Sequence, residues 1–451
     1  MTISRILVAN RSEIAVRVIR AARDLGLETV AVHSEADADA AHVALADEAV
    51  EIGPAQASRS YLDIDRLIDA ATGTGANAIH PGYGFLSENA AFAQRCEDED
   101  LTFVGPSAAT IREMGDKVEA RRIAADAGVP TVPGSDGAVD HDAARVVADE
   151  VGYPLLVKAA GGGGGRGIKV VDSTDALDDA LTSARREAES AFGSGAVYLE
   201  RFLPSARHIE VQVLGDGEHA VHLFDRECSL QRNRQKVVEE GPSPALGDAR
   251  RGAITASAVR LAEAIGYRSA GTVEYLVDPD SGEFFFIELN TRIQVEHPAT
   301  EMITGIDLVA AQLRIAGGEP LWLAQDDITR RGCAIECRIN AEDPANDFFP
   351  SPGVIEQLTW PAGPWVRVDT ALAAGDEVPP YYDSLIAKLI VLGGDRDQAL
   401  ARCRRALDEL TIAPIQTTAP MLRALLDDDD VRAGDYSTTF LEQWVEDWKE
   451  R

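Results

Sequence analysis

The hydrophobic and polar positions at the start of the chain alternate between short strand patterns and one helical pattern. The strand-like run RILVAN precedes a helical period over residues 12–25, and a second strand-like run, ETVAVHS, follows it. In this helix, one apolar face would be formed by Ile14, Val18, Ala22 and Leu25. Similar signals in NAIHPGYG and LTFVGPS continue this βαβ pattern to about Asp116. The pattern predicts an open α/β region at the N-terminus.

From Tyr153 the pattern changes to paired strands. PLLVKAA and GIKVV flank a glycine run, and the later apolar runs are HIEVQVL, AVHLFDREC, GTVEYLV and EFFFIELN. The tail mixes strands and helices and ends in an amphipathic helix near residues 440–448, while the acid run 427–430 is typical of a solvated helix end. At roughly 150 residues per domain, the 451 residues predict three domains. We place them at residues 1–116, 117–330 (with a lid at about 132–203) and 331–446.

The composition is that of a globular but strongly acidic protein. There are 75 Asp and Glu against 43 Lys and Arg, a formal net charge of -32. Such a surface repels phosphate backbones, so we expect no nucleic-acid partner. Neither a membrane-spanning run nor a signal-peptide pattern is found, which predicts a cytoplasmic location. The five cysteines are scattered without a zinc spacing, which argues against a disulfide framework or a structural zinc.

The basic residues are almost all arginine. Only six lysines stand against 37 arginines. One interpretation is halophilic adaptation, because a salty cytoplasm screens the repulsion among the acids. The other is codon drift in a GC-rich genome toward Ala, Asp and Arg.

The run AAGGGGGRG, residues 159–167, is the strongest local signal. Five consecutive glycines carry a large entropic cost, which implies that the backbone approaches a ligand closely or moves. The run lacks the GK[ST] of a Walker loop, and a strand follows it where a dinucleotide fingerprint would start a helix. A hairpin tip that wraps a polyphosphate fits better, with Lys158 at the end of the preceding strand. The alternative is a flexible surface hairpin.

Two glutamates interrupt the apolar strands of GTVEYLVDPDSGEFFFIELN. A hairpin centred on Ser281 places Glu274 opposite Glu288, and like charges in such a pair are destabilising. A divalent cation would reverse the sign of that interaction, and the oxygens of both carboxylates and Asn290 suit Mg²⁺. The alternative is a pair of exposed acids.

In NTRIQVEHP, alternation predicts an extended segment with one polar face, which holds Asn290, Arg292, Gln294 and Glu296. Arginine offers a fork for a carboxylate-like anion, and Glu296 is available as a base. CAIECRINAED repeats this pattern and places Cys333 and Cys337 in the core.

Other polar positions have two interpretations. A lone histidine such as His208 is more often structural than functional. The basic residues of CSLQRNRQKVVEE, Arg232, Arg234 and Lys236, are a candidate anion site or a patch that answers Glu239 and Glu240.

Together these stretches resemble biotin carboxylase, the ATP-grasp component of the biotin-dependent carboxylases. The resemblance runs from RILVANRSEIA through HPGYGFLSEN, MGDK, GGGGGRG, RHIEVQV, FIELNTRIQVEHPATEMITGIDL and ECRINAEDP to VPPYYDSLIAKL, over about residues 3–415. It implies an α/β fold with an N-terminal open α/β (pre-ATP-grasp) domain, an ATP-grasp domain with a glycine-rich lid, and a C-terminal mixed α+β domain.

The resemblance also implies an activity: ATP- and bicarbonate-dependent carboxylation of biotin on a carrier protein, through carboxyphosphate. The implied ligands are ATP, Mg²⁺ or Mn²⁺, bicarbonate and carrier-bound biotin. The implied partners are a biotin carboxyl carrier protein or domain, a second copy of the chain, and a carboxyltransferase subunit. No Met-Lys-Met attachment motif is present, so we expect the carrier to be a separate chain or a further domain. The acyl acceptor stays open among acetyl-CoA, propionyl-CoA and pyruvate.

Roles for individual residues follow from the same resemblance. Lys236, Arg292 and the Val295 backbone would bind bicarbonate, Glu296 would act as general base, and Arg338 would stabilise the biotin enolate. The metal would be held by Glu274, Glu288 and Asn290. The nucleotide would be contacted by Lys117, Lys158, Gly163, Gly164, Gly165, Arg166, the backbone of Glu200, Arg201, Phe202 and Leu203, and by His208 and Gln231.

The chain departs from the family pattern at two places. Ser12 replaces a usual glycine, and we expect it to cap a helix. Asn233 and Arg234 stand where Arg and His are usual, which puts fine nucleotide contacts in doubt. Two rival functions remain: another ATP-grasp ligase of the carbamoyl-phosphate or purine-pathway type, and a nucleotide-binding regulatory module without catalysis.

Overall fold

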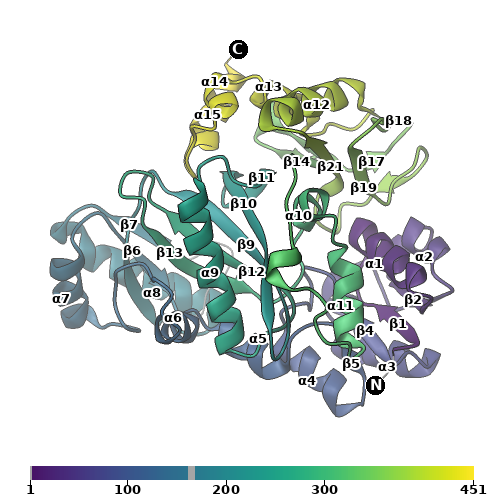
Figure 1. Ribbon diagram of the computed structural model, residues 1–451, viewed down its shortest axis with the longest axis horizontal. Helices are drawn as coiled ribbons and strands as arrows, with labels where there is room; N and C mark the ends of the chain where they lie inside the picture. The colour runs from purple at the N-terminus through teal and green to yellow at the C-terminus, as the bar shows by residue number, and fades with distance from the viewer. Residues whose placement is uncertain (1–2, 161–167, 451) are drawn as a thin grey trace.

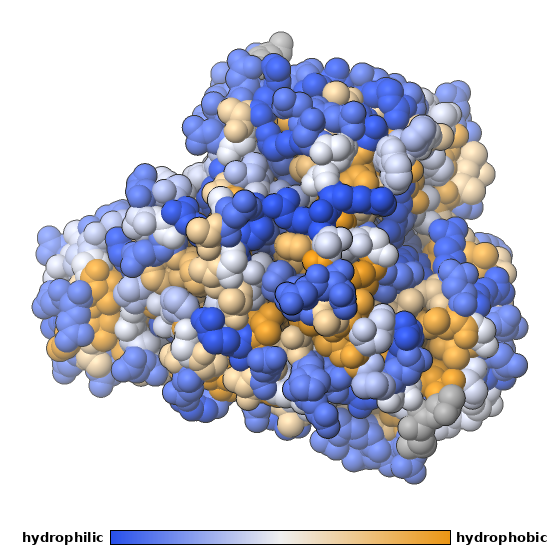
Figure 2. All heavy atoms as spheres, in the orientation of Figure 1, coloured by the Kyte–Doolittle hydropathy of each residue, from blue (hydrophilic) through white to orange (hydrophobic). Residues whose placement is uncertain are grey.

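The computed structural model describes residues 3–160 and 168–450. Figure 1 shows three lobes around a long central sheet: the N-terminal lobe in purple, a lobe of α7, α8, β6 and β7 at the far left, and the C-terminal lobe in green and yellow at the top. Figure 2 shows a mostly hydrophilic face with hydrophobic residues in scattered groups. Within the described part of the chain, no helix is long and apolar enough to cross a membrane.

The N-terminal region contains a five-stranded parallel sheet in the order β3-β2-β1-β4-β5. Buried aliphatic residues of the strands and of the first helix form its core, as the sequence pattern predicts. The strands are β1 (Arg5–Val8), β2 (Glu28–His33), β3 (Glu48–Glu51), β4 (Ala78–His80) and β5 (Thr102–Phe103). The helices are α1 (Ser12–Asp24), α2 (Ala41–Leu45), α3 (Ile64–Thr74), α4 (Ala90–Asp98) and α5 (Ala108–Gly115).

A small antiparallel sheet, ordered β7-β6-β8, forms the separate lobe. Its strands are β6 (Leu155–Ala159), β7 (Ile168–Val171) and β8 (Val197–Arg201), and its helices are α7 (His141–Val151) and α8 (Thr174–Phe192). The pairing of β6 with β7 confirms the predicted hairpin. The glycine run 161–167, including Gly163, Gly164, Gly165 and Arg166, lies outside the described residues.

The central sheet has eight strands in the order β13-β12-β9-β10-β11-β14-β21-β19. Their bounds are β9 (Arg207–Asp216), β10 (Ala220–Arg232), β11 (Gln235–Gly241), β12 (Arg268–Val277), β13 (Phe284–Asn290), β14 (Cys333–Asn340), β19 (Val366–Thr370) and β21 (Leu385–Gly393). Because β11 pairs with β14, this sheet continues across the predicted domain boundary near residue 331. The domain bounds themselves stay a prediction.

Helices cover this sheet and complete the C-terminal lobe. They are α6 (Lys117–Asp126), α9 (Asp248–Ala264), α10 (His297–Thr304), α11 (Leu308–Ala316), α12 (Arg396–Glu409), α13 (Ala419–Leu425), α14 (Asp429–Ala433) and α15 (Phe440–Lys449). The short strand pairs are β15 (Glu342–Asp343) with β16 (Phe349–Pro350), β17 (Gly353–Val354) with β20 (Glu377–Val378), and β18 (Gln357–Thr359) with β22 (Thr411–Ala413). The predicted C-terminal helix is confirmed, and Asp428 in the acid run caps α14.

The expectation for Ser12 is wrong. The residue that precedes α1 is Arg11, and Ser12 opens the helix with a φ of 58° and without a capping hydrogen bond. That is the left-handed region, where a Cβ costs energy and glycine does not. Cys333 and Cys337 lie in the core, as expected, and all five cysteines are buried free thiols.

Candidate functional site

The centre of the candidate site is Lys236 on β11, which faces three carboxylates. Its ammonium lies 2.6 Å from Glu296 and 3.1 Å from Glu274, and it also contacts Glu210. Glu210 stands on β9 and Glu274 on β12, next to each other in the sheet register. Neighbouring strands therefore gather charges that are far apart in the sequence.

Glu296 lies between two cations. Its Oε1 accepts from Lys236 Nζ at 2.6 Å, and its Oε2 accepts from Arg338 Nη2 at 2.9 Å. Burial alone would raise the pKa of Glu296, but Lys236, Arg338 and Arg226 outweigh burial and hold this pKa well below its usual range. The side chain is therefore an ionised carboxylate, able to accept a proton.

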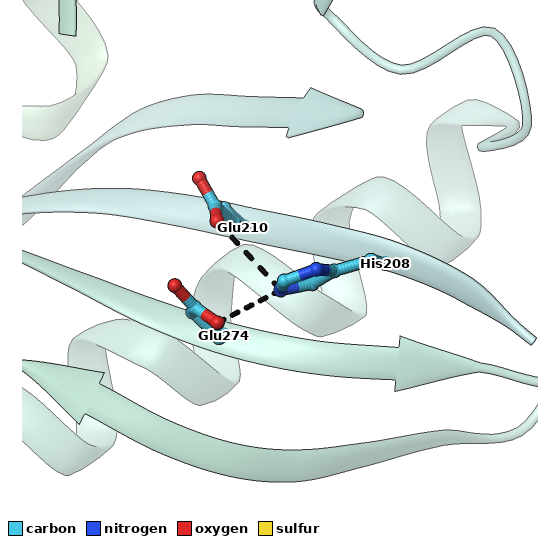
Figure 3. A group of neighbouring side chains, drawn as sticks. All are labelled: His208, Glu210 and Glu274. Atoms are coloured by element: carbon cyan, nitrogen blue, oxygen red, sulfur yellow. Dashed lines mark hydrogen bonds and ion pairs between the residues drawn. The ribbon is translucent and has the colours of Figure 1, made fainter. Parts of the chain in front are cut away.

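His208 and Glu274 form a second contact at the edge of this cluster (Figure 3). His208 Nε2 lies 2.8 Å from Glu274 Oε2, and the imidazole also faces Glu210 at 3.7 Å. Burial would lower the pKa of His208, but the charge of Glu274 raises it on balance. The three ligand atoms lie close enough to hold a metal ion, although Lys236 already pairs with both carboxylates.

Arg338 stands on β14 between two acids. Its Nε donates to Glu239 at 2.6 Å, in addition to its contact with Glu296. Glu239 on β11 pairs in register with Glu336 on β14, and both side chains are fully buried. Burial raises the pKa of both carboxyls, and the charge of Arg338 opposes this rise at Glu239.

The extended segment that was predicted after Asn290 is wrong. Strand β13 ends at Asn290, and the chain then turns to enter α10, which has proline in its first turn. The polar groups still converge: Arg292 Nη2 donates to Asn290 at 3.0 Å and Gln294 donates to Glu274 at 2.9 Å. A turn, not strand alternation, brings them together.

The predicted register of Glu274 opposite Glu288 is confirmed. Glu288 lies 3.4 Å from Lys117, and Asn290 Nδ2 donates to Glu274 at 2.6 Å. Two facing carboxylates and an amide oxygen are the ligands that a hard divalent cation prefers. These three residues therefore fit Mg²⁺ or Mn²⁺.

The residues expected at the nucleotide lie on separate elements. Lys158 on β6 pairs with the side chain of Glu200 on β8, which also contacts Arg121. The amides of Arg201 and Phe202 donate to Pro133 and Pro154 at 2.8 and 3.0 Å, so an adenine contact has to use other backbone groups of residues 200–203. Gln231 pairs in register with Lys236. Lys117 begins α6.

A cavity of about 420 Å³ opens beside the cations. Its lining includes the charged residues Lys236, Arg292 and Arg338 and the aromatic residues Tyr83 and Tyr382. This volume and this mixture of aromatic and charged groups suit a small organic ligand.

Comparisons with known proteins identify the family. The family described as "Biotin carboxylase, N-terminal domain" matches residues 2–111, "Carbamoyl-phosphate synthase L chain, ATP binding domain" matches 116–324, and "Biotin carboxylase C-terminal domain" matches 336–443. The first and third separate this chain from a carbamoyl-phosphate synthase. The chain belongs to the biotin carboxylase family.

Relatives share almost the whole length of the chain. Biotin carboxylase from Pseudomonas aeruginosa is 53% identical over 98% of both chains. A pyruvate carboxylase subunit from Methanothermobacter thermautotrophicus is 49% identical, over 98% of this chain and 90% of that protein. The biotin carboxylase domain dimer of Hydrogenobacter thermophilus 2-oxoglutarate carboxylase, solved with MgADP, ADP and bicarbonate, gives a TM-score of 0.93 at 48% identity over 98% of both chains. The ATP-grasp fold of the biotin carboxylase family is thereby confirmed.

Sequence reasoning missed several residues of this biotin carboxylase site. Glu210 interrupts an apolar strand, the same signal that identified Glu274. Fully buried Arg226 donates to Gln294 at 2.6 Å, and Glu88 holds Arg292 Nε at 3.0 Å. The basic cluster was only partly right, because Arg232 lies over the ring of Phe348 while Lys236 enters the site. Lys236 does not form the expected ion pair with Glu239 or Glu240. These two acids pair with Arg338 and Arg396 instead.

Proposed function

We propose that this biotin carboxylase activates bicarbonate with Glu296 and passes its carbon to biotin in the adjoining cavity. The observation that supports this most directly is the position of Glu296, whose two oxygens contact Lys236 and Arg338. Both cations line the cavity, and we assign Lys236 to the substrate anion and Arg338 to biotin. The Glu296 carboxylate thus lies beside the cations that we assign to both half-reactions.

In the first half, Lys236 and Arg292 bind bicarbonate by charge, and the Val295 backbone contributes a polar contact. Glu296 accepts the proton of bicarbonate, and the freed oxygen attacks the γ-phosphorus of ATP. The bond to the β,γ-bridging oxygen breaks, which gives carboxyphosphate and ADP. Positioning and charge neutralisation are what phosphoryl transfer demands of an enzyme.

Lys117, Lys158, His208 and Gln231 are the residues we assign to ATP. Glu274, Glu288 and Asn290 would hold Mg²⁺, which neutralises phosphate charge when bound. Among them, Glu274 is already fixed by donors from His208 and Asn290. The chain thus orients its own ligand oxygens.

In the second half, carboxyphosphate breaks into CO₂ and phosphate inside the closed site. Phosphate takes the ureido proton of biotin, and the resulting nitrogen nucleophile attacks CO₂. Arg338 lines the cavity and would stabilise the enolate oxygen that forms. Tyr83 and Tyr382 give apolar walls for a bicyclic ring system.

The partners we propose, in the cytoplasm, are a carrier that presents biotin, a second copy of the chain, and a carboxyltransferase subunit. The dimer of the Hydrogenobacter domain supports the second of these partners. The pyruvate carboxylase relative supports an acceptor that need not be acetyl-CoA. Purification of the biotinylated protein that binds this chain, followed by an assay with acetyl-CoA, propionyl-CoA and pyruvate, would identify the acceptor.

The activity is tested by ATP cleavage with and without bicarbonate and free biotin. We expect ADP release that requires bicarbonate and increases with biotin, together with carboxybiotin formation. ADP release with ammonia or an amine in place of biotin would favour another ATP-grasp ligase. Nucleotide binding without turnover would favour the regulatory module.

A further inference from the structure

The turn between β13 and α10 carries Arg292 and Glu296, although it lies in neither a strand nor a helix. Backbone carbonyls outside regular structure need other donors when they are buried. The orientation of this turn therefore depends on the side chains that reach its carbonyls.

Each of three successive carbonyls in the turn has a side-chain partner. Ile293 O accepts from Arg292 at 3.3 Å, and Gln294 O accepts from His297 Nδ1 at 2.7 Å. Val295 O accepts from Lys388 Nζ at 3.0 Å. The first two donors are local, but Lys388 comes from β21, 93 residues further along the chain. The last peptide before Glu296 is thus fixed by a different part of the molecule.

Lys388 is fully buried and also bridges two acids. Its ammonium lies 3.2 Å from Glu13 on α1 and 3.9 Å from Asp369 on β19. Glu13 accepts from the hydroxyl of Tyr83, a wall of the cavity. Asp369 independently accepts from Nε and Nη2 of Arg367, at 2.7 and 2.6 Å. One ammonium therefore connects the Glu296 turn to the ring that faces the ligand.

The position of Lys388 in the sheet separates its role from that of Arg338. The two cations are direct partners in the β14–β21 register. Arg338 turns to Glu239 and Glu296, whereas Lys388 turns to Glu13 and the Val295 carbonyl. A buried ammonium has three N–H donors that need acceptors, and its two acids are not the only partners of Lys388. Its remaining hydrogen bond goes to the catalytic turn.

We propose that Lys388 is a positioning residue for biotin carboxylation, which holds the Val295–Glu296 peptide and, through Glu13, the Tyr83 ring. This inference rests on the proposed function of Glu296. Lys388 touches no reacting atom in this scheme. It fixes the direction from which Glu296 meets bicarbonate.

The test is Lys388→Met in the full-length protein, compared with Arg251→Met. Arg251 is a buried cation that pairs with Asp225 at 2.7 Å, outside the candidate site. We expect Lys388→Met to lower kcat/KM for bicarbonate by about 10²-fold, the cost of a misplaced catalytic group, with the affinity for MgATP unchanged. Arg251→Met should lose thermal stability but keep wild-type kcat/KM per folded molecule. Wild-type kinetics in Lys388→Met, or an equal loss of MgATP affinity, would overturn the proposal.

Lys388→Met leaves Glu13 without its cation and could unfold the protein. The double variant Lys388→Met/Glu13→Gln removes both charges, a change that buried pairs often tolerate. It should fold, keep the bicarbonate defect, and show faster hydrogen exchange at residues 294–297. Unchanged exchange at these residues would contradict the role of Lys388, whatever the activity of the wild-type protein. Absence of bicarbonate-dependent ATP cleavage in the wild-type protein would instead refute the proposed function.

Discussion

At the scale of single residues, the candidate site gives one carboxylate two cationic neighbours. A base held at a low pKa stays ionised far below neutral pH, so its proton acceptance depends on the substrate displacing part of this pairing. Lys236 and Arg338 are the groups that bicarbonate and biotin are proposed to contact. Substrate binding would then weaken the same contacts that keep Glu296 ionised, which would make it a stronger base when the substrate arrives.

Glu296→Gln tests the base. The amide keeps the shape but cannot accept a proton, so bicarbonate-dependent ATP cleavage should fall by ~10²–10⁴. The matched control is Glu227→Gln, a buried glutamate on β10 whose partners include Arg207, Ser229 and Ser243. The control should keep the wild-type rate. A rate that survives in Glu296→Gln would show that another group takes the proton.

Arg338→Gln should separate the two half-reactions. ATP cleavage should largely survive while carboxybiotin formation falls by ~10²-fold or more, because the enolate forms only after carboxyphosphate. Loss of this cation should also raise the pKa of Glu296, since Arg338 is one of the charges that lower it. The base works only when deprotonated, so the acid limb of the pH–rate profile should move to higher pH. Equal loss of both half-reactions, or an unmoved limb, would contradict this role.

The sequence predicts some contacts of the site and leaves others hidden. The position of the turn predicts the partner of Glu274 only to within one residue, because a β-bulge between Glu274 and Tyr275 shifts the register and brings Glu288 opposite Glu274. Glu296 could be identified by its motif but not placed by alternation, because the strand ends at Asn290. The hydrogen bond from Lys388 to Val295 O joins residues that are far apart in the sequence. No local periodicity indicates that such residues are close in space. The pairing of strands within one hairpin is therefore predictable apart from bulges, and contacts between distant strands are not.

At the scale of elements, the two departures from the family pattern both occur at left-handed backbone. Asn233 and Arg234, with φ of 49° and 64°, form the two-residue loop that joins β10 to β11. Asparagine adopts this conformation readily, which explains how that position tolerates the change. Ser12 has no such advantage, because a serine side chain gives little relief at positive φ.

Ser12→Gly should therefore stabilise the protein. Relief of left-handed strain at the start of α1 should raise the free energy of unfolding by roughly 1 kcal/mol, measured by denaturant titration. The control is Ser107→Gly, because Ser107 caps α5 at normal backbone angles by accepting from the amide of Thr110 at 3.1 Å. That variant should lose a few tenths of a kcal/mol. A destabilised Ser12→Gly would mean that the serine makes a compensating interaction.

At the scale of the whole molecule, the distribution of charge separates paired lysines from exposed acids. All six are paired with an acid: Lys117, Lys158, Lys169, Lys236, Lys388 and Lys449. The side chains of exposed acids such as Asp429 and Asp248 are 98% and 93% accessible to solvent. The net charge of -32 therefore lies mainly at the surface, where salt can screen it.

The halophilic interpretation predicts stabilisation by salt. The Debye length falls from ~30 Å at 0.01 M to ~3 Å at 1 M, so the melting temperature should rise with KCl into the molar range. The apparent KM for bicarbonate should rise in parallel, because chloride competes for the cations that bind the anion. Sucrose, which strengthens burial without screening, is the control and should reproduce less of the gain. A melting temperature that is flat or falls in KCl would leave codon drift as the explanation for the composition.

The pairing of β11 with β14 also limits how a chain of this kind can be inherited. A recombination event that imported everything from β14 onward from a relative would join two parents inside one continuous sheet. The backbone hydrogen bonds between β11 and β14 do not depend on the side chains, except where proline removes a donor. The contact of Glu239 with Arg338 would not, because each parent would supply one half of it. Selection should therefore keep these two residues together. Viable hybrids should be those in which both parent proteins have Glu at position 239 and Arg at position 338.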